Sequence, residues 1–189
     1  MSAKVICFAN NKGGSGKTTT CSNIACAMAT DGKRVLMIDG DMQLNLTISY
    51  FDEERALAYA KNGKNICEAV KGGKDLSAFI VPTEFEGLDM VPSSPSMSGI
   101  EFELFSKPKR DFVLLECLKP VSEKGIYDYI LIDAPPMLGC WATNILCASD
   151  FVVIPVEASP WGLFGLANMF EFCKRAKRPS HETEILGIA

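Results

Sequence analysis

Three glycines near the start of the chain have the spacing of a loop that binds an anion. Gly13, Gly14 and Gly16 stand between the apolar run 5–9 and the helix-like run 20–29. Because glycine lacks a Cβ atom, such a loop can curl tightly and point its backbone N–H groups inward at an anion. The positive end of the following helix dipole would lie at the same point. The order of apolar strand, glycine loop and helix therefore predicts a phosphate site.

Side chains suited to a nucleoside triphosphate follow the glycines. Lys17 is spaced to reach the β- and γ-phosphates, and Thr18 to place its hydroxyl on Mg²⁺. The standard pattern requires glycine at position 11, where this chain has Asn11 followed by Lys12. The stretch Lys-Gly-Gly-Ser-Gly-Lys-Thr-Thr resembles the deviant Walker A motif of the ParA/MinD family of ATPases. The residues expected to bind the nucleotide are Lys12, Gly13, Gly14, Ser15, Gly16, Lys17, Thr18 and Thr19.

A second apolar run, 35–38, ends in a polar segment with two acids, Asp39 and Asp41. The carboxyl ends of parallel strands are where α/β sheets bind ligands, so we expect both acids near the phosphates. The segment resembles the family's Asp-x-Asp-Pro-Gln-x-Asn switch I, with Met42 in place of the proline. Because proline would fix one φ angle, we expect Met42 to loosen this loop.

A third apolar run, 127–133, ends in Asp133. This is the Walker B pattern, in which the carboxylate holds Mg²⁺, often through water. The Ala-Pro-Pro that follows resembles the family's switch II, which senses the γ-phosphate. The residues expected to hold the metal are therefore Thr18 and Asp133.

The residues expected to act in hydrolysis are Lys12, Lys17 and Asp41. Ala134 stands where many P-loop ATPases carry a glutamate, so Asp41 is the predicted residue that orients the attacking water, with Asp39 next. Lys17 already supplies the lysine that one loop needs. Lys12 matches the family's signature lysine, which is implied to reach the phosphates of a facing subunit. The alternative is an exposed lysine without a partner, since surface ion pairs are usually weak.

The cysteines and the hydropathy indicate a reducing compartment. Eight cysteines form no Cys-x-x-Cys pair and lie mostly inside apolar runs, as buried small side chains do in cytoplasmic proteins. Cys140 has the spacing from the Walker B aspartate that a cluster-ligating cysteine has in the nitrogenase iron protein, a relative of the family. No second ligand is evident, so we expect Cys140 to be packed in the core. No apolar run approaches the ~18 residues that span a bilayer, and no signal peptide is evident.

The net charge of −4 argues against a surface built as a whole for nucleic acid. Two local basic clusters remain, at residues 107–110 and 174–178. Each is either a solvated segment or a confined patch for phosphates. The cations that we expect to contact DNA, if the family resemblance holds, are Lys174, Arg175, Lys177 and Arg178.

Strands and helices alternate throughout, so the predicted fold is a single three-layer α/β domain of the P-loop NTPase class. Its mostly parallel sheet carries helices on both faces. A chain of 189 residues with 48% apolar residues suits one such domain with a buried core. The strands are expected at 4–9, 35–38, 88–92, 127–133, 151–155 and 184–189, and the helices at 18–30, 52–61, 66–70, 112–118, 141–148 and 161–176.

The resemblance to ParA/Soj-like partition ATPases implies a slow ATPase that binds ATP and Mg²⁺ and forms a homodimer around nucleotide. It also implies non-specific DNA binding and a ParB-like partner that stimulates hydrolysis, in the cytoplasm on the nucleoid. Family members are longer, so residues 1–189 are expected to lack the last strands and a C-terminal helix. Two alternatives remain, a nucleotide-binding interaction module with little turnover and a MinD-like membrane-associated ATPase. No stable membrane insertion is expected.

Overall fold

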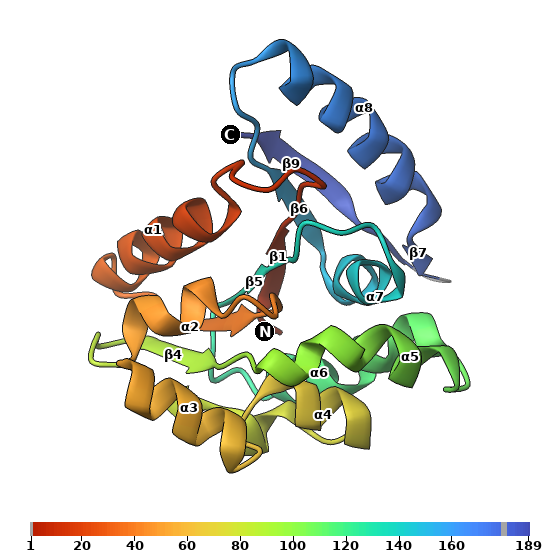
Figure 1. The fold of residues 1–189 in the computed structure, drawn as a ribbon. Coiled ribbons are helices and arrows are strands. Elements are labelled where there is room, and N and C mark those ends of the chain that lie inside the picture. Colours follow the sequence, from red (N-terminus) through yellow and green to blue (C-terminus); the bar gives the residue numbers. More distant parts are fainter. Residues whose placement is uncertain (1, 179–180) are drawn as a thin grey trace.

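The computed structural model describes residues 2–178 and 181–189, without the side chains at positions 160, 161, 163, 164, 177, 178, 181 and 182. A seven-stranded sheet forms its centre, in the order β3-β4-β2-β5-β1-β6-β9 (Figure 1). The strands are β1 (Lys4–Phe8), β2 (Val35–Asp39), β3 (Val81–Pro82), β4 (Leu88–Val91), β5 (Tyr129–Asp133), β6 (Phe151–Ile154) and β9 (Glu184–Ile188). A short hairpin pairs β7 (Lys177–Arg178) with β8 (His181–Glu182).

Helices surround the sheet. They are α1 (Lys17–Thr30), α2 (Asn45–Tyr50), α3 (Glu53–Lys61), α4 (Ile66–Gly72), α5 (Ile100–Phe105), α6 (Val113–Glu123), α7 (Cys140–Ala148) and α8 (Pro160–Arg175). Three short 3₁₀ turns cover Leu76–Phe79, Pro95–Gly99 and Arg110–Phe112. The predicted three-layer α/β fold is confirmed.

The sheet buries apolar side chains on both faces, because its central strands alternate their side chains between two cores. Val5 and Cys7 of β1 face a core shared with α4 to α8. Ile6 and Phe8 face a second core shared with α1 and α2. Figure 1 shows α1 on one side of the sheet and α7 and α8 on the other. The apolar runs in the sequence are continuous because neither face of these strands meets solvent.

Parallel pairing brings the chemically important strand ends to one edge. Every neighbouring pair in the sheet is parallel except β3 with β4. Phe8 at the end of β1 lies opposite Asp133, and Asp39 at the end of β2 lies opposite Asp133 from the other side. The glycine loop leaves β1 at this edge, so the loop and both aspartates converge as expected.

The elements that were not predicted are helices α2 and α5, strands β3, β7 and β8, and the three 3₁₀ turns. Helix α2 begins inside the switch I segment, directly after Leu44. Leu44 occupies the cap position with a φ of 58° and makes no side-chain hydrogen bond to the helix. Helix α5 follows the serine-rich turn, and β3 adds a two-residue antiparallel edge. Helix α6 also runs beyond the predicted end at residue 118, through Pro120, because Val121 is buried against the core. Elsewhere the predicted boundaries differ from the observed ones by two residues or fewer.

Candidate functional site

The glycine loop presents an open cradle at the start of α1. Gly14 and Gly16 have φ angles of 73° and 86°, a region that side chains rarely adopt. A Cβ atom at Gly13 or Gly14 would meet no atom within 4 Å, so the loop surface is unfilled there. No side chain caps α1 at Gly16, which leaves its first-turn N–H groups available to an anion. Thr19 lies exposed in that first turn.

Lys17 lies buried in the middle of this cradle. Its Nζ donates a hydrogen bond to the Lys12 carbonyl oxygen at 3.1 Å. Burial lowers the pKa of Lys17, and the nearby carboxylates of Asp133 and Asp41 oppose that shift. A buried cation among acids, held by its own loop, fits a ligand that brings several negative charges.

Thr18 and Asp133 meet beside Lys17. The Thr18 hydroxyl donates to Asp133 Oδ2 at 2.6 Å. Asp133 is 1% exposed, and its Oδ1 has no hydrogen-bond partner among the described residues. Burial raises the pKa of Asp133 to about 7, against the hydrogen bond from Thr18. A buried carboxylate oxygen without a partner, next to a hydroxyl, fits a divalent cation with oxygen ligands. The predicted metal residues therefore lie together.

Asp39 and Asp41 have different environments. Asp39 Oδ2 accepts from the backbone N–H of Thr47 at 2.8 Å and from its hydroxyl at 2.6 Å, while Oδ1 accepts from Asp41 N at 3.1 Å. Burial raises the pKa of Asp39 to about 6, and these bonds lower it only partly. Asp39 thus holds the switch I backbone, whereas Asp41 is one of the two carboxylates that act on Lys17.

Switch I is held in place despite Met42. The Ser93 hydroxyl donates to the Asp41 carbonyl oxygen at 2.7 Å, and Asp41 Oδ1 accepts from Gln43 N at 3.1 Å. Ser93 N donates in turn to the Thr47 hydroxyl at 3.0 Å. Sequence analysis missed Ser93, although a polar residue directly after strand β4 should lie at the same sheet edge. These hydrogen bonds restrict the switch I backbone, as a proline at position 42 would have done.

The first residues of the loop are tied to the segment after β6. Asn10 Nδ2 donates to the Pro155 carbonyl oxygen at 2.6 Å, and Lys12 N donates to Asn10 Oδ1 at 3.1 Å. The Lys12 ammonium forms an ion pair with Glu157, and both side chains are partly exposed. Glu157 was not predicted, because 145 residues separate it from Lys12. The signal for it was again a polar residue that follows a buried strand.

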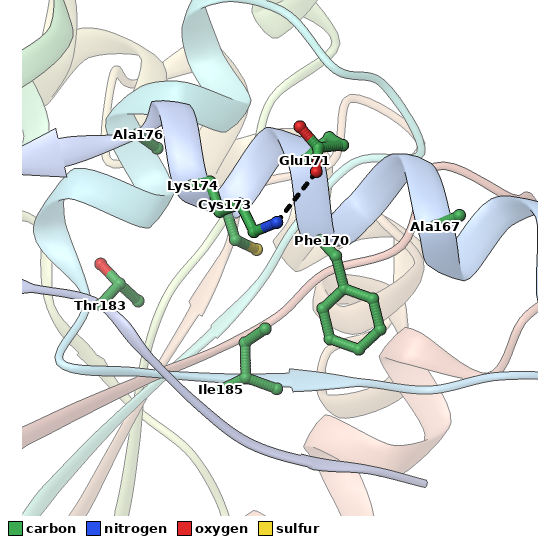
Figure 2. Close-up of a pocket in the computed structure, with 8 residues that line it drawn as sticks. All are labelled: Ala167, Phe170, Glu171, Cys173, Lys174, Ala176, Thr183 and Ile185. Carbon is green, nitrogen blue, oxygen red and sulfur yellow. Dashed lines mark hydrogen bonds and ion pairs between the residues drawn. The ribbon is translucent and has the colours of Figure 1, made fainter.

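The basic residues of α8 stand apart from this cradle. A hollow of about 470 Å³ lies between α8 and β9. Figure 2 shows the residues that line it, among them Phe170, Cys173 and Ile185. Lys174 on its rim forms an ion pair with Glu171 at 3.0 Å and is largely exposed. The side chains of Lys177 and Arg178, which we expected to contact DNA, lie outside the described residues.

The described residues contain no preformed cluster of metal-binding side chains. Within residues 2–178 and 181–189, no group of three or more His, Cys, Asp or Glu side chains is arranged to hold a metal ion. A magnesium ion at Asp133 would therefore take most of its ligands from phosphate and water, as Mg²⁺ commonly does.

Cys140 is partly buried, with its thiol 3.8 Å from Asp111 Oδ1. In the described part of the chain, no helix is long and apolar enough to cross a membrane.

A glycine loop between β1 and α1, with acids at the ends of two neighbouring strands, defines a P-loop nucleotide-binding domain. A family model described as an AAA domain matches residues 3–185. The chain belongs to this family, within the ParA/MinD group of P-loop ATPases that its motifs indicate.

Curated relatives agree with this assignment. The chain is 36% identical to the chromosome partitioning protein ParA of Myxococcus xanthus, over 88% of this chain and 56% of the relative. It is 37% identical to the sporulation initiation inhibitor protein Soj of Bacillus subtilis, over 88% of this chain and 63% of the relative. The chain thus spans a little over half the length of these proteins.

Solved structures share the fold. A cobyrinic acid a,c-diamide synthase from Mycobacterium smegmatis, solved with an ATP analog and magnesium, matches with a TM-score of 0.86 and 29% identity. That match covers 98% of this chain and 73% of the other. A putative plasmid partition protein from Borrelia burgdorferi B31, bound to AMPPNP, matches with a TM-score of 0.82 and 29% identity. It covers 100% of this chain and 76% of the other.

Proposed function

We propose that this domain binds ATP with Mg²⁺ and hydrolyses it slowly, as the nucleotide switch of a DNA partition system. The observation that carries the proposal is the buried, unpartnered Oδ1 of Asp133, next to the Thr18 hydroxyl and Lys17. A buried polar atom without a partner is costly, so its place at the mouth of a phosphate cradle supports a ligand there. Relatives solved with an ATP analog or AMPPNP support the same ligand.

The residues around the cradle have distinct roles in this proposal. The loop amides from Gly13 to Thr19 hold the phosphate oxygens, and Lys17 offsets their charge. Thr18 and Asp133 hold the magnesium ion, which when bound neutralises charge on the β- and γ-phosphates. Because Lys17 is held by the Lys12 carbonyl oxygen, it is already directed into the loop before nucleotide enters.

Asp41 orients the attacking water in this proposal. Phosphoryl transfer depends mainly on positioning and charge, so a carboxylate fixed near the γ-phosphate can suffice. Asp41 is held through its carbonyl oxygen, which accepts a hydrogen bond from Ser93. Both carboxylate oxygens of Asp39, by contrast, accept hydrogen bonds, from backbone N–H groups and from the Thr47 hydroxyl. This difference in hydrogen bonding supports Asp41, rather than Asp39, as the residue that orients the attacking water.

Lys12 acts across a homodimer in this proposal. It lies at the rim of the loop, and its side chain is 35% exposed, so it can leave Glu157 and reach the phosphates of a facing subunit. A cation supplied in trans stabilises charge on the transferring phosphoryl group and ties dimerisation to ATP.

The partners are proposed from the relatives. We propose non-specific DNA and a ParB-like activating protein as partners, in the cytoplasm on the nucleoid, because the chain is similar to a protein named for chromosome partitioning. The net charge of −4 requires a confined basic patch for DNA, such as Lys174 and Arg175 with their neighbours on α8 and β7.

The test is equilibrium binding of ATP in the presence of Mg²⁺, with Lys17→Ala as the variant and Lys33→Ala as the control. Lys33 is an exposed lysine on the turn after α1. We expect Lys17→Ala to weaken ATP binding at least about 100-fold, since it removes a buried charge-assisted contact. Equal affinity in the variant and the wild type would refute the assignment. A turnover assay with and without DNA then separates an ATPase from a binding module.

A further inference from the structure

The start of α7 is fixed by a carboxylate from another helix. Glu101 of α5 accepts hydrogen bonds from Cys140 N at 2.9 Å through Oε2 and from Trp141 N at 3.1 Å through Oε1. The residue before α7 is Gly139, which offers no side-chain cap, and a Cβ atom there would collide with the Glu101 carboxylate. Glu101 therefore satisfies two amides that α7 cannot, and its charge suits the helix dipole.

From this fixed position, Trp141 reaches switch I. Its ring is 3% exposed, and its indole Nε1–H donates to the Gly40 carbonyl oxygen at 2.8 Å. Gly40 N donates to the Asp133 carbonyl oxygen at 2.9 Å. Gly40 is thus held on one side by the strand that ends in the proposed metal ligand and on the other by α7. The next residue is Asp41.

A cavity of about 100 Å³ separates switch I from the segment after β5. Its walls include Met42, Met97, Pro136, Met137 and Trp141. Gly40 itself is closely packed, since a Cβ atom there would lie 2.8 Å from the Asp133 carbonyl oxygen and 3.1 Å from Ile145 Cδ1. The Trp141 hydrogen bond adds a directional contact to this packing, beside the cavity.

We propose that Glu101 and Trp141 are positioning residues for Asp41. Glu101 fixes the first turn of α7, and Trp141 fixes the Gly40 backbone from that turn, so that the Asp41 carboxylate is held ready for the attacking water. The same link connects residues 134–139, between Asp133 and α7, to switch I. This inference rests on the proposed function, in which Asp41 orients the water.

The first test uses the nucleotide-free protein and amide hydrogen exchange. Trp141→Phe keeps a ring but removes the N–H donor, and Glu101→Gln removes one of two carboxylate acceptors on the partly exposed α5. We expect exchange in residues 40–44 to rise about fivefold to tenfold in both variants, as the loss of one hydrogen bond allows. Glu103→Gln, on an exposed position of the same helix, should leave it unchanged. Exchange in 40–44 that stays as in the wild type, or that rises equally over the whole chain, overturns the proposal.

The second test separates this inference from the proposed function. In steady-state ATP hydrolysis, Trp141→Phe should lower kcat about tenfold and leave KM within about twofold, because the ground-state contacts of the nucleotide persist. A higher KM with an unchanged kcat overturns the positioning role. Absence of turnover in the wild type would refute the ATPase proposal, and the exchange measurement would still decide whether Glu101 and Trp141 hold switch I.

Discussion

Lys12 is paired with Glu157 of its own chain, across the gap between the glycine loop and the segment after β6. The pair holds the proposed trans-acting lysine within its own subunit. Since Glu157 is 57% exposed, the attraction is modest and can be exchanged for the stronger charge of a triphosphate. The ion pair therefore competes with the proposed dimer contact.

Glu157→Gln should favour the nucleotide-dependent dimer, because it removes the competing partner of Lys12. We expect the dimer to form at a protein concentration about threefold lower, since a partly exposed ion pair contributes little. Sedimentation velocity with a non-hydrolysable ATP analogue measures this. The matched control is Glu171→Gln, which breaks the exposed pair with Lys174 on α8. Lys12→Ala should abolish the dimer and keep ATP binding; a variant that dimerises and hydrolyses normally would exclude the trans role.

Asp41→Asn and Asp39→Asn should affect different properties, the first the rate of hydrolysis and the second the stability of the fold. Asp41→Asn should keep ATP affinity and lower kcat by about 100-fold or more, the size of the loss expected for a group that orients and activates the water. Asp39→Asn should lower the free energy of unfolding by about 1–3 kcal/mol, because a buried amide cannot accept all the bonds that the carboxylate accepts. Steady-state kinetics and urea unfolding measure the two effects. Full turnover by Asp41→Asn would move the role to another residue.

The backbone of the glycine loop predicts unequal effects of two alanine substitutions. Gly14→Ala should lower the free energy of unfolding by about 1–2 kcal/mol, because its φ of 73° is costly for a residue with a Cβ. Gly13→Ala meets no atom within 4 Å and has no positive φ, so it should be close to neutral. Urea unfolding of the nucleotide-free protein tests this. Equal losses in the two variants would show that the positive φ of Gly14 does not set the cost.

The buried acids predict how stability depends on pH. The pKa values of Asp39 and Asp133 are raised to about 6 and about 7, so the folded protein binds more protons than the unfolded chain above pH 4. These groups therefore make stability fall as pH rises from about 4 to about 7. Asp133→Asn should reduce this slope, as measured by urea unfolding at pH 5 and pH 7. An unchanged slope would show that Asp133 does not carry the effect.

The sequence was informative wherever a local pattern decided the structure. Apolar runs such as 35–38 and 151–154 became strands because both faces of the sheet are buried. The glycine loop and Asp133 were found because loop and strand chemistry are visible within a few residues. Helix α2 was not predicted, because it begins after a residue without a polar capping side chain, Leu44, which has a left-handed conformation. It also lies within the switch I motif, whose residues were interpreted as ligand-binding groups and not as a helix.

The supporting contacts of the site could not be predicted from local patterns. Ser93 lies 52 residues from Asp41, and Glu101 lies 40 residues from Trp141. Strand order brings the first pair together and the packing of α5 against α7 the second, and no spacing within either segment indicates the partner. Sequence analysis could therefore name the groups for phosphate and metal, but not the residues that hold them in place.

The strand order also has a consequence for biosynthesis. Among the described strands, β1 pairs with β5 and β6 alone, whose residues come more than a hundred positions later. A central strand with such distant neighbours must close a long loop before its pairing is rewarded, which slows folding. During synthesis, residues 4–20 are made with the phosphate chemistry in place, but their strand has no neighbour in the described sheet until residues 129–133 appear. The glycine loop is thus made well before the strands that hold it, and it acquires its shape only after they appear.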